Sequence, residues 1–329
     1  MAVLVCGGAG YIGSHAVAEL LAKGEKVVVV DNIQTGHQPA VVDGAVLYQG
    51  DLRDAEFLDR VFTENEIEDV MHFAASSLVG ESVEKPLKYY ENNVYGTLCL
   101  LKAMKKHQVK RIVFSSTAAT YGEPKRIPIV ETDPPKPTNP YGETKLAIER
   151  MLKWTDKAEG IRYTALRYFN VAGAHPVLDI GEDHAVETHL IPIVLQVALG
   201  KREKILIYGD DYSTDDGTCI RDYIHVSDLV QAHISALEKL RNGAKSEIYN
   251  LGNGNGFSVK EVIETARQVT GKSIPAEIAP RRNGDPAVLI ASSEKAKKEL
   301  EWEPEYADLM MIIESAWRWH QKHPDGYID

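Results

Sequence analysis

The chain has 329 residues, more than one hydrophobic core usually serves, so we expect two domains. With 44 % hydrophobic and 26 % charged residues, its composition is that of a folded globular protein. The formal net charge of −11 offers no broad basic surface, and we expect neither nucleic acid nor membrane as a partner. Because no apolar run is long enough for a signal peptide or a membrane span, a cytoplasmic protein is favoured.

Cysteine and histidine spacing argues against disulfides and metals. Cys6, Cys99 and Cys219 are far apart, which is typical of a reducing compartment. The eleven histidines show no HExxH motif, and His184 and His189 are five residues apart, a poor spacing for one helical face. The sequence therefore predicts no metal site.

The first half of the chain alternates short β-branched runs with helical patterns. Strands are expected over residues 3–6, 26–30, 46–49, 70–73, 111–115 and 163–169, and helices over 14–23, 56–65, 90–107 and 141–154. This alternation is typical of βαβ units and predicts an α/β fold with a doubly wound, Rossmann-type parallel sheet. From residue 171 onward the pattern loosens, which indicates a smaller mixed α/β domain that binds the substrate.

A glycine-rich turn follows the first predicted strand. Gly7, Gly10 and Gly13 have the spacing GxxGxxG, and without Cβ atoms the turn lets backbone amides and a helix N-terminus receive a pyrophosphate. The alternative is a plain strand-to-helix turn. Asp31 ends the second strand 18 residues after Gly13, where a carboxylate can hold both ribose hydroxyls of an adenosine and repel a 2′-phosphate. The pair predicts NAD rather than NADP.

Tyr141 and Lys145 are four residues apart and therefore lie on one face of a helix. A free phenol has a pKa near 10, and lowering it by about three units needs roughly 4 kcal/mol of preferential phenolate stabilisation. Lys145 and a nicotinamide cation could supply it. The pair alone could be two surface residues of the helix; together with the glycine-rich turn it predicts a catalytic base.

Hydroxyl groups follow the strand at residues 111–115. Ser115, Ser116 and Thr117 stand at its carboxyl end, where they would face the same crevice and hydrogen-bond a reacting sugar oxygen. The alternative is ordinary turn chemistry. The position favours the functional interpretation.

These features together resemble the extended short-chain dehydrogenase/reductase superfamily and, within it, the UDP-glucose (UDP-galactose) 4-epimerases. The resemblance spans nearly the whole chain. It is carried by GGAGYIGSH from Gly7, His72–Ala75, FSSTAATYG at Phe114–Gly122, Tyr141–Lys145, RYFN at Arg167–Asn170, GTCIRDYIHV at Gly217–Val226, RRNGD at Arg281–Asp285 and the ending His323–Asp329.

The resemblance implies roles for individual residues. Tyr141 would be the base, Lys145 its electrostatic partner, and Thr117 would stand where many members carry serine. The cofactor NAD would lie against Gly7, Gly10, Tyr11, Ile12, Gly13, Asp31, Asn32, Asp51, Leu52, Phe73, Ala74, Ala75, Asn92, Thr117, Tyr141, Lys145 and Phe169. Ser77 replaces a lysine seen in some relatives.

The resemblance also implies a binding site for a UDP-sugar. Its residues would be Thr117, Tyr141, Asn170, His189, Leu190, Tyr208, Arg221, Tyr223, Arg282, Asp285 and Leu289. Arg221 and Arg282 can grip a diphosphate bidentately and so supply the positive charge that this acidic chain otherwise lacks. His189 stands where many relatives have asparagine. Leu289 stands where a tyrosine in similar epimerases narrows the sugar pocket.

The implied activity is reversible 4-epimerisation of UDP-glucose and UDP-galactose, through a 4-keto intermediate and enzyme-bound NADH. UDP-N-acetylglucosamine and UDP-N-acetylgalactosamine are possible further substrates. Related dehydratases and decarboxylases carry a carboxylate just after the threonine, where this chain has Ala118-Ala119. The sequence also leaves open a net dehydrogenase and a non-catalytic NAD-sensing protein.

The domain organisation follows from these assignments. We place an NAD-binding domain at residues 1–170 and a nucleotide-sugar-binding domain at residues 171–329. The apolar stretch at 223–240 could return to the first domain. A homodimer is the family expectation.

Overall fold

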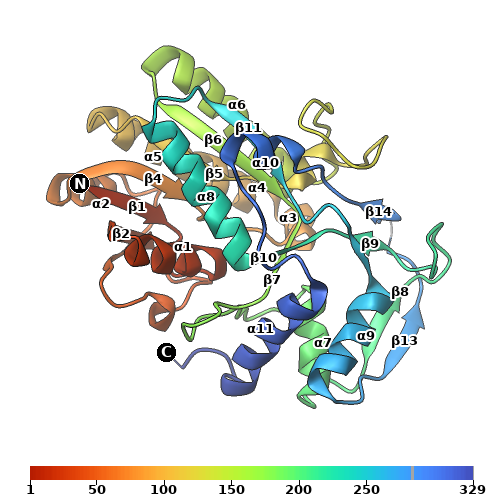
Figure 1. Cartoon of the computed structure of the whole chain (residues 1–329). Helices are drawn as coiled ribbons and strands as arrows, with labels where there is room; N and C mark the ends of the chain where they lie inside the picture. Colours follow the sequence, from red (N-terminus) through yellow and green to blue (C-terminus); the bar gives the residue numbers. More distant parts are fainter. Residues whose placement is uncertain (283–284, 329) are drawn as a thin grey trace.

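The structure is a computed structural model and describes residues 1–282 and 285–328. Within them, seven strands form one parallel sheet in the order β11-β6-β5-β4-β1-β2-β3 (Figure 1). The strands are β1 (Ala2–Cys6), β2 (Lys26–Asp31), β3 (Val46–Gln49), β4 (Ile67–His72), β5 (Arg111–Ser115), β6 (Arg162–Tyr168) and β11 (Glu247–Leu251). The strand order reverses between β1 and β4, which confirms the predicted doubly wound α/β class.

Helices cover both faces of this sheet. Leu4 and Cys6 point to one face and Val3 and Val5 to the other, as the two-residue period of a strand requires, and all four are buried. One face is covered by α2 (Ala55–Glu64), α5 (Gly96–Lys106) and α6 (Pro140–Glu159), and the other by α1 (Tyr11–Ala22), α8 (Val226–Arg241) and α10 (Glu294–Leu300). Between β4 and α5 lie α3 (Val79–Glu84), α4 (Pro86–Tyr89) and the π-helix η2 (Tyr90–Tyr95).

The second half of the chain builds smaller layers beside the carboxyl ends of the large sheet (Figure 1). Three small sheets pair β7 (Asn170–Ala172) with β10 (Tyr223–His225), β8 (Ile205–Tyr208) with β13 (Ala276–Ala279), and β9 (Ile220–Arg221) with β12 (Phe257–Ser258) and β14 (Val288–Leu289). The helices α7 (Leu190–Ala198), α9 (Val259–Thr270) and α11 (Leu309–Lys322) enclose a separate apolar core, and short 3₁₀ turns η1 (Gln38–Ala40) and η3 (Ala118–Tyr121) complete the elements.

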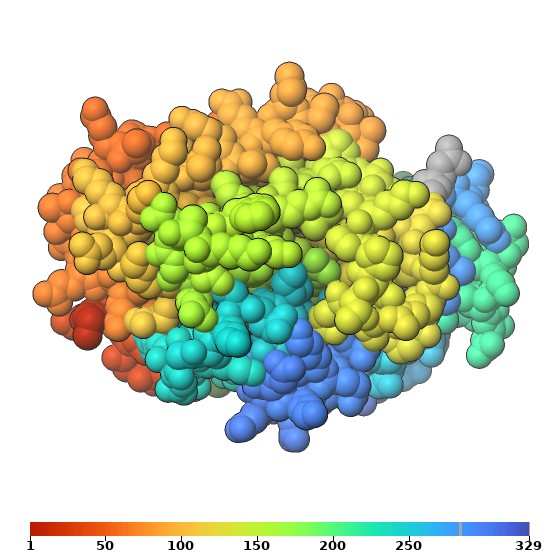
Figure 2. All heavy atoms as spheres, turned by 90° about the horizontal axis from the view of Figure 1, so that it is seen from above, coloured from red at the N-terminus to blue at the C-terminus, as the bar shows by residue number. Residues whose placement is uncertain are grey.

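The large sheet takes elements from beyond residue 170. Strand β11 pairs with β6, and α8 packs beside α1. The Ser246 hydroxyl, in the loop between α8 and β11, donates to Asp156 of α6 at 2.7 Å. Figure 2 shows this loop, in cyan, between α6 and the blue segment near residue 300. The division at residue 170 therefore stays a prediction, and the sheet itself crosses it.

In the described part of the chain, no helix is both long enough and apolar enough to cross a membrane.

Candidate active site

The predicted pyrophosphate turn connects β1 to α1 and has no room for a side chain at Gly7 or Gly13. Gly7 has φ +82°, and a Cβ placed on it would lie 2.6 Å from the Ala74 amide nitrogen. A Cβ on Gly13 would lie 1.9 Å from the Gly7 carbonyl oxygen. Gly10 is the N-cap of α1 and brings no side chain to the helix terminus. The first amides of α1 have no acceptor within the helix, so this turn fits an anionic group.

Carboxylates stand at the ends of β2 and β3, as predicted. Asp31 accepts hydrogen bonds from the Ala9 amide at 3.0 Å and the Ile33 amide at 2.9 Å, which aims it at the glycine-rich turn. Burial raises the pKa of Asp31 even against these bonds. Asp51 is paired with Arg53, whose hydrogen bonds lower the pKa of Asp51 to about 2, and it also accepts from the Asn32 amide group at 3.3 Å.

The segment after β4 is tied to α6. Asn93, which the sequence analysis missed, accepts from the Ser76 amide at 2.8 Å and donates to the Thr144 hydroxyl at 3.1 Å. Asn92 donates to the Ser76 hydroxyl at 3.2 Å. Asn93 is buried in η2, where a polar side chain that pins two elements has no signal in the sequence pattern.

Apolar members of the predicted cofactor site lie in the cores beside it. Ile12 and Phe73 pack on the α1 and α8 side of the sheet, and Leu52 and Ala74 on the opposite side. Tyr11 donates its hydroxyl proton to the Gly173 carbonyl at 2.6 Å. The four apolar side chains thus belong to the cores on the two faces of the large sheet.

Tyr141 and Lys145 lie on the first turns of α6. The Asn139 side chain caps this helix by accepting from the Gly142 amide at 2.9 Å, and Pro140 occupies its first turn. The Lys145 ammonium group lies 6.0 Å from the centre of the Tyr141 ring and donates to the Ser115 carbonyl at 2.8 Å. The geometry brings together the two residues that the spacing predicted.

Thr117 completes this group. It follows β5 and hydrogen-bonds the Tyr141 side chain. Burial raises the pKa of Tyr141 to about 12, although the bond to Thr117 lowers it in part, and burial lowers the pKa of Lys145 to about 7, against the attraction of Glu149. The protein alone therefore keeps the phenol protonated, and a cation beside it is needed to make Tyr141 a base.

A buried ion pair supports the same helix. Glu149 of α6 accepts two bonds from Arg167, at 2.9 and 2.5 Å, and one from the Ser116 hydroxyl at 2.6 Å. Both charged side chains are at most 4 % exposed. Arg167 lies in a motif of the resemblance, but its role in fixing α6 against β5 and β6 was not predicted.

The turn that follows Thr117 continues into an apolar cluster. Ala118, Tyr121 and Ile129 are buried, and Phe169 and Leu289 pack against them. Thr117 caps η3, which contains Ala118 and Tyr121. The predicted cofactor residue Phe169 and the predicted sugar residue Leu289 therefore pack against the turn that Thr117 begins.

The predicted diphosphate residues fall into two pairs. Arg221 forms an ion pair with Asp285 and donates to the Ile220 and Pro286 carbonyls at 2.8 and 2.9 Å. Arg282 stacks on the Tyr208 ring at 4.0 Å. Residues 283 and 284 of the RRNGD motif, and Asp329 of the terminal motif, lie outside the described residues.

The backbone places the other predicted substrate residues nearby. Leu289 of β14 is in register with Arg221 of β9, and Asn170 of β7 with Tyr223 of β10. The Asn170 side chain donates to the Asp222 carbonyl at 3.2 Å. Leu190 begins α7. These contacts place Leu289 beside Arg221, and Asn170 beside Asp222 and Tyr223.

His189 has partners that the sequence analysis did not foresee. Its Nδ1 lies 2.9 Å from Glu182 and 3.0 Å from Glu187, and His184 contacts the same two carboxylates. Burial lowers the pKa of His189, but the bonds and charges of these carboxylates outweigh it and raise the pKa to about 10. The spacing argument against a metal does not apply, because both histidines lie on a loop and not on a helix.

Comparison with known proteins agrees with this geometry. The NAD dependent epimerase/dehydratase family matches residues 3–252. A UDP-glucose 4-epimerase of Halalkalibacterium halodurans is 64 % identical, over 99 % of this chain and 98 % of the relative. A crystal structure of a UDP-glucose 4-epimerase superposes with a TM-score of 0.99 at 63 % identity, over 100 % of both chains. Another, from Bifidobacterium longum in complex with NAD+ and UDP, has a TM-score of 0.93 at 44 % identity, over 99 % of this chain and 100 % of that one.

Proposed function

We propose, because the chain belongs to the NAD-dependent epimerase/dehydratase family, that it interconverts UDP-glucose and UDP-galactose by inverting C4 of the hexose. The observation that carries the proposal is the grouping of Tyr141, Lys145 and Thr117. They lie at the carboxyl ends of the strands of the large sheet, where the glycine-rich turn also lies. The names of the relatives support the same substrate pair.

The cofactor is NAD. The glycine-rich turn at Gly7–Gly13 would receive its pyrophosphate and Asp31 its adenosine ribose, while Lys145 would hold the nicotinamide ribose. When bound, NAD accepts a hydride from C4 and gives it back, and its positive charge supplies the cation that the Tyr141 phenol lacks. The Asp31 carboxylate disfavours a 2′-phosphate at the same position.

The side chains supply proton transfer and orientation. Tyr141 takes the proton of the C4 hydroxyl and later returns it, and Thr117 hydrogen-bonds the reacting oxygen. For the hydrogen to return to the opposite face, the 4-keto hexose must turn while UDP stays bound. Arg221 and Arg282 would hold the diphosphate as the pivot.

The residues after Thr117 favour epimerisation over the related reactions. Ala118 is buried and Ala119 half-buried, and neither offers a carboxylate that could assist elimination or decarboxylation. A 4-keto intermediate would therefore be reduced again by the hydride that had left C4. A protein that only senses NAD would gain nothing from the grouped hydroxyl, phenol and ammonium.

The test is an assay of the purified chain with UDP-galactose and no added NAD. We expect UDP-glucose to form without release of NADH, because the cofactor is regenerated in each turnover. Tyr141→Phe should reduce turnover by roughly two to four orders of magnitude and leave UDP binding nearly unchanged. Stoichiometric NADH release by the parent, or near-normal turnover by the variant, would contradict the assignment.

We also propose an oligomeric state and a compartment for the chain: a homodimer in the cytoplasm. The three cysteines are free and buried, as suits a reducing compartment.

A further inference from the structure

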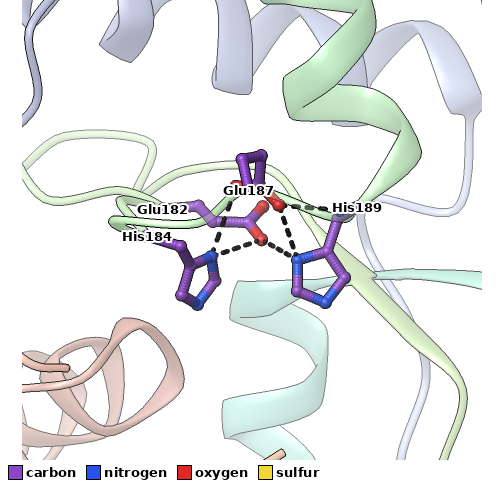
Figure 3. A group of neighbouring side chains, drawn as sticks. All are labelled: Glu182, His184, Glu187 and His189. Atoms are coloured by element: carbon purple, nitrogen blue, oxygen red, sulfur yellow. Dashed lines mark hydrogen bonds and ion pairs between the residues drawn. The ribbon is translucent and has the colours of Figure 1, made fainter. Parts of the chain in front are cut away.

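Four side chains of the loop before α7 converge on one point. They are Glu182, His184, Glu187 and His189, here called the 182–189 cluster, and one ligand atom from each lies within 4.8 Å of the others (Figure 3). The Nδ1 atom of His184 lies 3.4 Å from Glu182 and 3.3 Å from Glu187, and that of His189 lies 2.9 and 3.0 Å from the same residues. Figure 3 shows the two rings on either side of the carboxylates.

The burial of the two carboxylates makes this arrangement unusual. The Glu182 side chain is 4 % exposed and that of Glu187 is 5 % exposed. Two carboxylates this close repel each other when buried, and buried charges persist when they are paired or bind a metal. A dipositive ion would balance both charges, and each imidazole would bind it through Nδ1 after releasing the proton that this nitrogen holds against the carboxylates.

We propose that the 182–189 cluster binds a divalent transition-metal ion of the zinc class, held by two imidazoles and two carboxylates. Four protein ligands in a tetrahedron are the usual structural zinc site, and bonds of about 2.0–2.1 Å put neighbouring ligand atoms about 3.3–3.4 Å apart. The four nitrogen–oxygen separations, 2.9 to 3.4 Å, are close to this value, and all the ligand atoms lie within 4.8 Å of one another, so the side chains would have to move closer together to hold the ion. Imidazole ligands disfavour Mg²⁺ and Ca²⁺, which prefer oxygen.

The role of the ion would be to fix a loop that joins three parts of the fold. His189 is the N-cap of α7. Within the loop, Asp183 accepts from the Tyr327 amide at 2.9 Å, and the Gly181 amide donates to the Tyr327 hydroxyl at 3.0 Å. Asp183 also faces His37, which follows β2, at 3.4 Å. The ion would thus link the C-terminal segment and α7 to the large sheet, whatever reaction the chain catalyses.

The alternative is a network of hydrogen-bonded imidazolium–carboxylate pairs that needs no metal. A metal site and a metal-free network differ in the number of metal ions that the chain binds and in the visible spectrum after Co²⁺ is added. The full-length chain, stripped with a chelator, should bind one equivalent of Co²⁺ and show the intense visible bands of a tetrahedral complex. Added Zn²⁺ should displace Co²⁺, remove the bands and raise the unfolding temperature.

A double variant and a matched control locate the ion. His184→Gln with Glu187→Gln should abolish the Co²⁺ bands and weaken Zn²⁺ binding by at least about 100-fold, because even outer-shell partners of a metal cost about 10–100-fold. The control is Asp59→Asn with His107→Gln, a histidine–carboxylate pair at 2.7 Å outside this loop. It should leave the metal signal unchanged.

Several results would overturn the proposal. One is a parent chain that binds no stoichiometric Co²⁺ or Zn²⁺. Another is a Co²⁺ complex with only the weak spectrum of octahedral coordination. A third is a double variant with the same metal affinity as the parent. If the double variant does not fold, anomalous scattering at the zinc edge from crystals of the Zn²⁺-treated parent decides. The account requires the ion among the four side chains, and a chain with no ion there contradicts it.

Discussion

Lys145 shows how a single residue of this site works against the stability of the fold. Its side chain is 3 % exposed, and burial lowers the pKa of its ammonium group from 10.5 to about 7. Between these two pH values the unfolded chain holds a proton that the folded chain lacks. The free energy of unfolding therefore decreases as the pH falls through this window, by on the order of 4 kcal/mol, and this group causes no further change below about pH 7.

We therefore predict that Lys145→Met stabilises the NAD-free chain while it impairs turnover and NAD retention. The gain in unfolding free energy should be larger at pH 7 than at pH 9.5, because the cost that it removes is present in full only at low pH. Denaturant titrations at both pH values measure this. Lys153→Met, at an exposed position of the same helix, should change little at either pH. An equal gain at both pH values would contradict the cause given for the cost.

Leu289 sets the expected breadth of substrate. It is half-buried and, like Phe169, packs against Ala118 and Tyr121 in the turn that follows Thr117. Leucine is smaller than tyrosine, so we predict that the parent also epimerises UDP-N-acetylglucosamine. Leu289→Tyr should lower kcat/KM for this substrate by at least about tenfold more than for UDP-glucose, since pocket volume discriminates by about 1–3 kcal/mol. Leu289→Met, which keeps the volume, is the control; equal losses for both substrates in the tyrosine variant would show that another wall limits the pocket.

Among the elements, the β1–α1 turn has a geometry that tolerates little change. A Cβ on Gly13 would lie 1.9 Å from the Gly7 carbonyl oxygen, so Gly13→Ala must displace the turn itself. We predict loss of copurifying NAD and a lower unfolding temperature. Gly80→Ala in α3, where no neighbour lies within 4 Å, is the control and should retain both. Absorbance of the nucleotide released on denaturation measures the bound NAD, and full NAD content in Gly13→Ala would refute the role of the turn.

Local patterns predicted these elements because local chemistry determines them. Strand β5 and strand β3 have the predicted bounds, and α6 begins at Pro140, one residue before the predicted start. Strand β11 was missed, since the five residues Glu247–Leu251 form a short run in which polar and apolar residues are mixed. Their place beside β6 depends on α8 and on contacts between residues far apart in the sequence.

The same distinction holds for the site. Tyr141, Lys145 and Asp31 were predicted from spacing and strand position, because a helix face and a strand end are local features. Asn93 and the Arg167–Glu149 pair were not, because their partners lie on other elements. The 182–189 cluster was rejected for a spacing that matters only on a helix.

At the scale of the whole molecule, the two halves of the chain are interleaved. The sheet that carries the residues predicted to bind NAD is completed by β11 and covered on one face by α8 (Figure 1). The C-terminal segment contacts the loop before α7 through Tyr327. Tyr141 of α6, and Arg221 and Arg282, which are predicted to bind the diphosphate, therefore come from parts of the chain that are joined by shared elements. Such an arrangement suits a reaction in which the nucleotide stays fixed while the sugar turns.

The most direct test of the central claim is epimerisation in heavy water, followed by NMR of the product. We predict that UDP-galactose is converted to UDP-glucose with no deuterium at C4, because the C4 hydrogen leaves and returns as a hydride that does not exchange with solvent. Stoichiometric deuterium at C4 would mean removal of a proton from carbon, and would contradict the mechanism proposed for Tyr141, Lys145 and Thr117.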